Sequence, residues 1–111
     1  MTQEERSSIV PGTLEMLVLQ TLSLEPEHGW GISERIRRLS GEVFAVNQGT
    51  LYPALERLQQ RGWIRSEWRV TENNRRARYY VLTRTGRRRL EAESMAWQRT
   101  SAAIDQIMRT T

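Results

Sequence analysis

The sequence has 111 residues, of which 38% are hydrophobic and 27% charged, and these proportions fit one compact domain with at most one appended element. It contains no cysteine, which excludes disulfide bonds, thiolate nucleophiles and zinc sites with cysteine ligands. No apolar stretch approaches the roughly 20 residues that cross a bilayer, and the polar, acidic N-terminus is unlike a signal peptide. We therefore expect a cytoplasmic protein without a membrane partner.

Positive charge is concentrated in the second half of the chain. Residues 1–62 hold 6 Arg and 8 acidic residues, whereas residues 63–111 hold 11 Arg and 5 acidic residues. Within that half, residues 75–89 carry 7 Arg and no acidic residue. A concentrated field of one sign on a small protein is typical of a polyanion binder, so nucleic acid is the first partner to consider.

Two amphipathic helices are predicted in the first part of the chain. The segment after Pro11-Gly12 has apolar residues at helical spacing and predicts a central helix that Pro26 ends. Its core-facing residues are Leu14, Met16, Leu17, Val18, Leu19, Thr21 and Leu22. Residues 25–29 are interpreted as a turn, and a second, shorter helix follows and stops at Ser40-Gly41. Its predicted buried residues are Ile32, Ile36 and Leu39, and its predicted exposed residues are Arg35 and Arg38.

A third helix begins after Asn47, a residue favoured as an N-cap, and is closed by Gly62. Pro53 is tolerated because the carbonyl it presses on belongs to Gly49, at the start of the helix. The predicted buried stripe consists of Leu51, Leu55 and Leu58. Four polar residues are left off that stripe and can hydrogen-bond to bases or phosphates: Gln48, Thr50, Tyr52 and Arg57.

After Gly62 the helical spacing of apolar residues ends, and side-chain character repeats every second residue, as in a strand. Ile64, Ser66, Trp68 and Val70 are predicted to share one face of a strand. A polar loop over residues 71–76 leads to a second alternating run at 78–83, so the two form a β-hairpin with a basic tip. Thr83 or Thr85 then caps a final helix that runs close to the C-terminus.

The order of elements predicts a mainly α fold with a small β-hairpin, a winged helix-turn-helix followed by a C-terminal dimerisation helix. Residues 1–83 form the predicted DNA-binding domain and residues 84–111 the dimerisation helix. In such a unit the third helix enters the major groove while the hairpin reaches the flanking backbone. The predicted DNA-binding residues are Gln48, Thr50, Tyr52 and Arg57 on the helix and Arg75, Arg76 and Arg78 on the hairpin.

Several motifs resemble those of the PadR family of bacterial transcriptional regulators. They are residues 49–55 (GTLYPAL), 78–80 (RYY), 82–86 (LTRTG), 12–19 (GTLEMLVL) and 28–32 (HGWGI). The resemblance implies a winged helix-turn-helix homodimer of the short subfamily, which usually represses a nearby promoter and is often released by a small ligand. The sequence departs from the family at Gly31, where a larger polar residue is usual, and at Asn47-Gln48, which opens the third helix.

The final helix carries a short heptad pattern. Leu90, Trp97 and Ile104 are seven residues apart and Met108 occupies a companion position, so these four residues form the predicted dimer interface. A dimer would set two recognition helices about 34 Å apart on a palindromic operator. Trp97 either fills that interface, which we favour, or stacks against a small aromatic effector in a space left by neighbouring small residues.

Enzymatic activity is not expected. The chain has one His, no Cys, and no Gly-rich loop ending in Gly-Lys-Ser/Thr, and it shows neither a metal site nor a cofactor motif. The sequence therefore predicts a sequence-specific regulator of double-stranded DNA, acting as a repressor at the nucleoid. The alternative is a winged-helix module for a protein partner or structured RNA, which would not need a polar third helix and a basic hairpin tip together.

Overall fold

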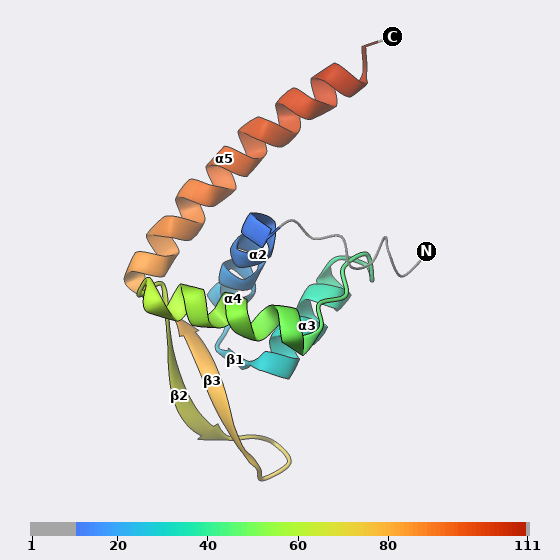
Figure 1. The fold of residues 1–111 in the computed structure, drawn as a ribbon. Helices are drawn as coiled ribbons and strands as arrows, with labels where there is room; N and C mark the ends of the chain where they lie inside the picture. The colour runs from blue at the N-terminus through green and yellow to red at the C-terminus, as the bar shows by residue number, and fades with distance from the viewer. Residues whose placement is uncertain (1–10, 111) are drawn as a thin grey trace.

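A computed structural model describes residues 11–110 of the chain. Its elements are α2 (Pro11–Leu24), β1 (Glu27–His28), α3 (Gly29–Leu39), α4 (Gln48–Gln60), β2 (Ile64–Val70), β3 (Arg76–Leu82) and α5 (Arg84–Met108). In Figure 1, α2, α3 and α4 pack together, the β2–β3 hairpin extends downward, and α5 extends upward. The predicted mainly α fold with a small antiparallel sheet and a long final helix is confirmed. Among these residues, no helix is long and apolar enough to cross a membrane.

One hydrophobic core joins all the elements of the N-terminal part. Its buried residues come from three helices, the inner end of the sheet and the first part of α5: Leu14, Val18, Leu19, Leu22, Ile32, Ile36, Leu51, Ala54, Leu55, Leu58, Ile64, Tyr80 and Leu90. The predicted stripes of the first and third helices are thus confirmed, except that Met16 and Leu17 are only partly buried. α5 contributes a single buried side chain to this core, and most of its residues are exposed.

The helix ends are set by local capping. Asn47 accepts a hydrogen bond from the Thr50 backbone N–H at 2.8 Å, as an N-cap should. Gly62 follows α4 with a φ of 75°, a left-handed conformation that favours glycine and ends the helix. At α5 the cap is Thr83, which accepts from the Gly86 N–H at 3.0 Å. The positions of α4 and α5 therefore follow from their own residues.

The sheet has three strands where the sequence predicts two. Strand β1 was predicted as a turn, but Glu27 pairs with Tyr80 and His28 with Tyr79, which gives the antiparallel order β1-β3-β2. A strand of two residues has no alternation to detect, because only its pairing with β3 defines it. In the hairpin, β3 begins at Arg76, two residues earlier than predicted, where it pairs with Val70.

Two predictions for α3 were wrong. Arg35 was expected on the exposed face, yet it is 7% exposed and donates hydrogen bonds to the Thr21 carbonyl and to the carboxylates of Glu25 and Glu27. It lies three residues after Ile32, so helical spacing turns it toward the core, and the two carboxylates make its burial tolerable. Leu39 was expected to be buried but is 60% exposed, in the last turn of the helix.

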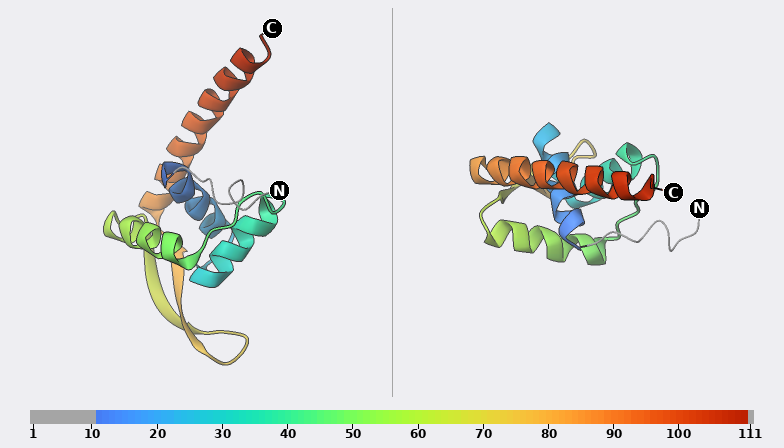
Figure 2. Two further views of the ribbon diagram at one scale, coloured as in Figure 1. Left: turned by 45° about the vertical axis from the view of Figure 1, so that its right-hand side comes forward. Right: turned by 90° about the horizontal axis from the view of Figure 1, so that it is seen from above.

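The outer half of the hairpin extends beyond the helices. Trp68 and Val70 alternate with their neighbours as predicted, but they are 57% and 63% exposed, whereas Ile64 on the same face is buried. We call this β2–β3 hairpin, residues 64–82, the wing. Figure 2 shows that the wing and α5 extend from opposite sides of the packed helices.

Candidate nucleic-acid interface

A concave face lies between the wing, the start of α3 and the exposed side of α4. It encloses about 1350 Å³ and includes Trp30 from α3, Tyr52 and Glu56 from α4, and Trp68, Arg76 and Arg78 from the wing. Strand β1 pairs with β3 at one border of this face, so the wing is attached directly to the residue that precedes α3. The sheet and the two helices therefore hold the concave face as one surface.

The four polar residues predicted on the third helix lie on two different edges of α4. Gln48 donates a hydrogen bond to Ser33 Oγ of α3 at 2.8 Å, and Tyr52, four residues later, borders the concave face. On the other edge, Arg57 donates to Glu15 of α2 at 2.9 Å. Thr50 lies seven residues before Arg57 and so shares its edge. The structure brings Gln48 and Tyr52 together and separates them from Thr50 and Arg57.

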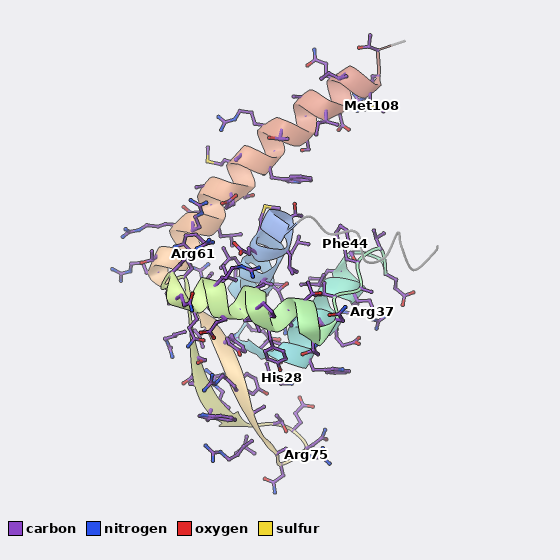
Figure 3. All side chains as sticks on the ribbon, viewed as in Figure 1. His28, Arg37, Phe44, Arg61, Arg75 and Met108 are labelled. Carbon is purple, nitrogen blue, oxygen red and sulfur yellow. The ribbon has the colours of Figure 1, made fainter. Side chains whose placement is uncertain are left out.

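The predicted wing arginines are exposed at the outer end of the hairpin. Arg75, Arg76 and Arg78 all lie on the concave face, and no carboxylate of residues 11–110 forms an ion pair with them. By contrast, Arg69 in the neighbouring strand pairs with Glu67 at 2.6 Å. Figure 3 shows Arg75 at the tip of the wing, far from α5. This part of the wing can attract an anion without first breaking an internal ion pair.

Residues 18–92, which run from α2 to the start of α5 and so include the whole concave face, match the model of the Transcriptional regulator PadR-like family. The chain belongs to this family. It is therefore a transcriptional regulator, and the expectation that it is not an enzyme is confirmed by its family.

Solved structures of other PadR proteins are similar along nearly the whole chain. A PadR family transcriptional regulator from Eggerthella lenta is 30% identical, with 90% of this chain and 85% of that chain covered and a TM-score of 0.74. A PadR-like transcriptional regulator from Bacillus cereus has the same fold, with a TM-score of 0.83 at 24% identity and 95% and 100% of the two chains covered. An uncharacterized protein from Lysinibacillus sphaericus is 25% identical over 103 residues, 93% of this chain and 94% of that one.

Two glycines at the start of α3 allow close packing against Tyr52 of α4 and Glu27 of β1 in this PadR-like chain. A Cβ at Gly29 would lie 2.6 Å from the Tyr52 hydroxyl, and one at Gly31 would lie 2.3 Å from the Glu27 carboxylate carbon. His28 caps α3, because its Nδ1 accepts from the Gly31 N–H at 3.0 Å. The unusual Gly31 is therefore matched to Glu27, whose side chain occupies the space that a larger residue would need.

Sequence reasoning missed three residues of the concave face in this PadR-like chain. Trp30 and Glu56 received no role, and Trp68 was treated only as one member of an alternating strand. A signal for Trp68 exists, because it lies four residues beyond the last buried position of β2, Ile64, where a large apolar side chain has no core to enter.

Burial raises the pKa of the Tyr80 hydroxyl, and the nearby Tyr52 hydroxyl raises it further, while Arg78 acts in the opposite direction. Tyr80 pairs with Ser66, which lies between the buried Ile64 and the exposed Trp68 on the same face of β2. Tyr80 is therefore at the boundary between the core and the concave face. Its phenol therefore stays neutral over a wider pH range than a free tyrosine, and it adds no negative charge near the arginines.

The residues predicted for the dimer interface have two different environments. Leu90 is 7% exposed and packs in the core of its own chain. Trp97, Ile104 and Met108 are 48%, 51% and 76% exposed on the part of α5 that leaves the domain. Trp97 also borders a groove of about 380 Å³ between α2 and α5, together with Met16, Leu19 and Trp63. Figure 3 shows Met108 close to the free end of α5.

Proposed function

We propose that this PadR-like regulator binds double-stranded DNA with sequence specificity through its concave face. The observation that carries the proposal is the position of Arg75, Arg76 and Arg78, which form no ion pair with a carboxylate of residues 11–110, on the same concave face as the polar edge of α4. A helix in the major groove with a basic hairpin beside it is the arrangement that a winged helix-turn-helix uses. Such a protein would act in the cytoplasm, at the nucleoid.

The residues of α4 have different proposed roles. Tyr52 and Gln48, on the edge beside the concave face, are proposed to contact base edges. Thr50 and Arg57, on the opposite edge, are proposed to contact phosphates that flank the bases. Arg57 would first have to leave Glu15, so we expect it to contribute less than the wing arginines. Accordingly, Tyr52→Phe should change the preferred operator sequence by about 1 kcal/mol at one base pair, as measured by selection from a random duplex library.

The outer part of α5 supports the proposal of a homodimer. Its exposed apolar residues are Met95, Trp97, Ile104, Ile107 and Met108. Pairing of this helix with a second copy would remove that surface from water and place two recognition helices on a palindromic operator. In this dimer Leu90 anchors α5 to its own domain, and residues 84–111 serve as the dimerisation helix. Repression follows if the operator overlaps a promoter.

The groove between α2 and α5 supports a second proposal, that a small aromatic effector stacks on Trp97 and releases the DNA. Tryptophan fluorescence of the dimer should be quenched by at least one member of a broad panel of aromatic compounds, and quenching should be lost in Trp97→Ala. A panel without any quencher would leave Trp97 as a packing residue of the dimer.

A mobility shift assay tests DNA binding directly. Duplex fragments from upstream of the protein's own gene and its neighbours are titrated at about 50 and 200 mM salt. We expect an affinity in the nanomolar range for one fragment and marked weakening at the higher salt. Structured RNA and unrelated duplexes serve as competitors. If RNA competes better than every duplex, or no fragment binds, the proposed function is wrong.

A further inference from the structure

Trp68 is an exposed tryptophan whose ring is in contact with charge instead of with the core. Trp68 is 57% exposed, although tryptophan residues are highly buried on average. The guanidinium carbons of Arg76 and Arg78 lie 5.0 and 5.3 Å from the centre of its ring, within the range of a cation–π interaction. Exposure alone is unremarkable on a protein surface, but two cations over one exposed ring are a specific arrangement.

The register of the wing explains this arrangement. Trp68 pairs directly with Arg78, and Arg76 lies two residues away on the same strand and therefore on the same face. All three residues border the concave face. Neither arginine has a carboxylate partner among the described residues, and the Trp68 indole is the aromatic ring over which both guanidinium groups lie.

We propose that Trp68 is a positioning residue, which holds Arg76 and Arg78 in the orientation that contacts the phosphate backbone of DNA. The proposal rests on the proposed function and names a residue that it does not include. A free arginine on a hairpin loses side-chain entropy when it binds a phosphate, and an arginine already stacked on an aromatic ring has less to lose. A guanidinium that stacks its flat face on a ring keeps its N–H groups free to donate to a phosphate, because those groups point outward from its edge.

The test compares binding of the operator fragment and of an unrelated duplex across a series of salt concentrations. Trp68→Leu should weaken binding to both duplexes by about fivefold to thirtyfold, the loss expected when two arginine side chains must be ordered on binding. The slope of affinity against salt should stay unchanged, because both arginines can still reach phosphates. Trp68→Phe keeps an aromatic face and should recover most of the affinity.

A double-mutant cycle separates positioning from direct contact with DNA. With Arg76→Ala and Arg78→Ala already present, Trp68→Leu should cause no further loss of affinity. Trp30→Leu is the matched control, since Trp30 is 64% exposed on the same concave face and no arginine of residues 11–110 lies over its ring. Its effect, whatever its size, should be the same with and without the two arginines.

A measurement without DNA makes failure of this proposal distinguishable from failure of the proposed function. In the free protein, the ring current of Trp68 should shift the NMR signals of the Arg76 and Arg78 side chains, and Trp68→Leu should remove the shift. If the wild type binds DNA and the Trp68→Leu variant binds it equally well, Trp68 is not a positioning residue. The same conclusion follows if Trp68→Leu causes the same loss of affinity with and without Arg76 and Arg78. If the wild type binds no duplex while the ring-current shift is present, both the proposed function and this role are overturned.

Discussion

Trp63 and Trp68 lie five residues apart, and each carries two arginines over its ring. Over Trp63, at the junction of α4, β2 and α5, the guanidinium carbons of Arg61 and Arg89 lie 5.1 and 4.9 Å from the ring centre. These distances are close to those at Trp68. Trp63 is partly buried and packs against the core, whereas Trp68 is mostly exposed on the wing.

The two sites differ in the charge around the arginines. Arg61 also pairs with Glu15 of α2, and Arg89 pairs with Glu93 one turn further along α5. Around Trp63 each positive charge therefore has a carboxylate, and the contacts connect elements of the fold. Around Trp68 the described residues supply no carboxylate to Arg76 or Arg78. The same side-chain contact thus stabilises the fold in one place and leaves charge available for an anion in the other.

The largest expected effect is a loss of stability on Gly86→Ala, a change in the region around Trp63. A Cβ at Gly86 would lie 1.9 Å from the backbone oxygen of Trp63, and backbone atoms cannot move aside easily. We expect the free energy of unfolding to fall by about 3 kcal/mol, measured by denaturant titration. Gly12→Ala is the control, because its Cβ meets no described atom within 4 Å, and its effect should stay below about 1 kcal/mol. Equal effects of the two changes would contradict the close packing at Trp63.

Removal of the three wing arginines should affect binding and spare the fold. In the variant with Arg75, Arg76 and Arg78 all changed to Ala, we expect DNA affinity to fall by about thirtyfold at moderate salt. The slope of log affinity against log salt should fall by about 3, one for each lost phosphate contact. The melting temperature should fall only slightly, because these arginines form no ion pair with the described residues and the contacts of Arg76 and Arg78 with Trp68 are exposed. Arg61→Ala, the control, should leave the salt slope unchanged.

The change Trp63→Leu should lower stability and leave DNA binding unchanged, whereas Trp68→Leu should mainly weaken DNA binding. Because Trp63 packs against the core and Trp68 is mostly exposed, Trp63→Leu should lower the free energy of unfolding by about 1 to 2 kcal/mol more than Trp68→Leu does. The salt dependence of DNA binding should remain that of the wild type. Denaturant titration and DNA titration of both variants check this, and a similar stability loss in both would mean that Trp68 also supports the fold.

The smallest effect is expected at Tyr80, on the boundary between the two regions. Burial raises its pKa in the folded state, so the folded protein keeps this proton at a pH where the unfolded chain has released it. Its contribution is therefore complete below a pH of about 10, the ordinary pKa of tyrosine, and is lost as the pH rises through the folded-state pKa. Stability measured from about pH 8 to pH 11 should fall less steeply in Tyr80→Phe than in the wild type. If stability falls equally steeply with pH in the wild type and in Tyr80→Phe, the raised pKa of Tyr80 is contradicted.

Much of the fold could be predicted because its signals are local. Asn47 and Thr83 cap helices with their own side chains, and Gly62 ends α4 through its own φ. The stripe of Leu51, Leu55 and Leu58 is periodic within a single helix. Each of these features involves residues within one or two turns of one another, and such neighbours are visible in a sequence.

The features that escaped prediction depend on contacts between elements, which the periodicity of a single helix or strand does not encode. Strand β1 exists only because Glu27 and His28 pair with β3, about fifty residues later. Arg35 is buried because Glu25 and Glu27 neutralise it across the start of α3. No pattern of hydrophobicity reports either fact, since both are decided by which side chains the fold places in contact.

The sequence by itself determined the caps of α4 and α5, most of the buried residues of α2 and α4, and that the second half of the chain is rich in arginine. Only the tertiary structure decided what each arginine does. Arg57 meets Glu15, 42 residues away, while Arg76 and Arg78 meet the Trp68 ring and no described carboxylate. The physical reason is that charge compensation acts over a few ångströms, and the fold alone brings distant residues that close.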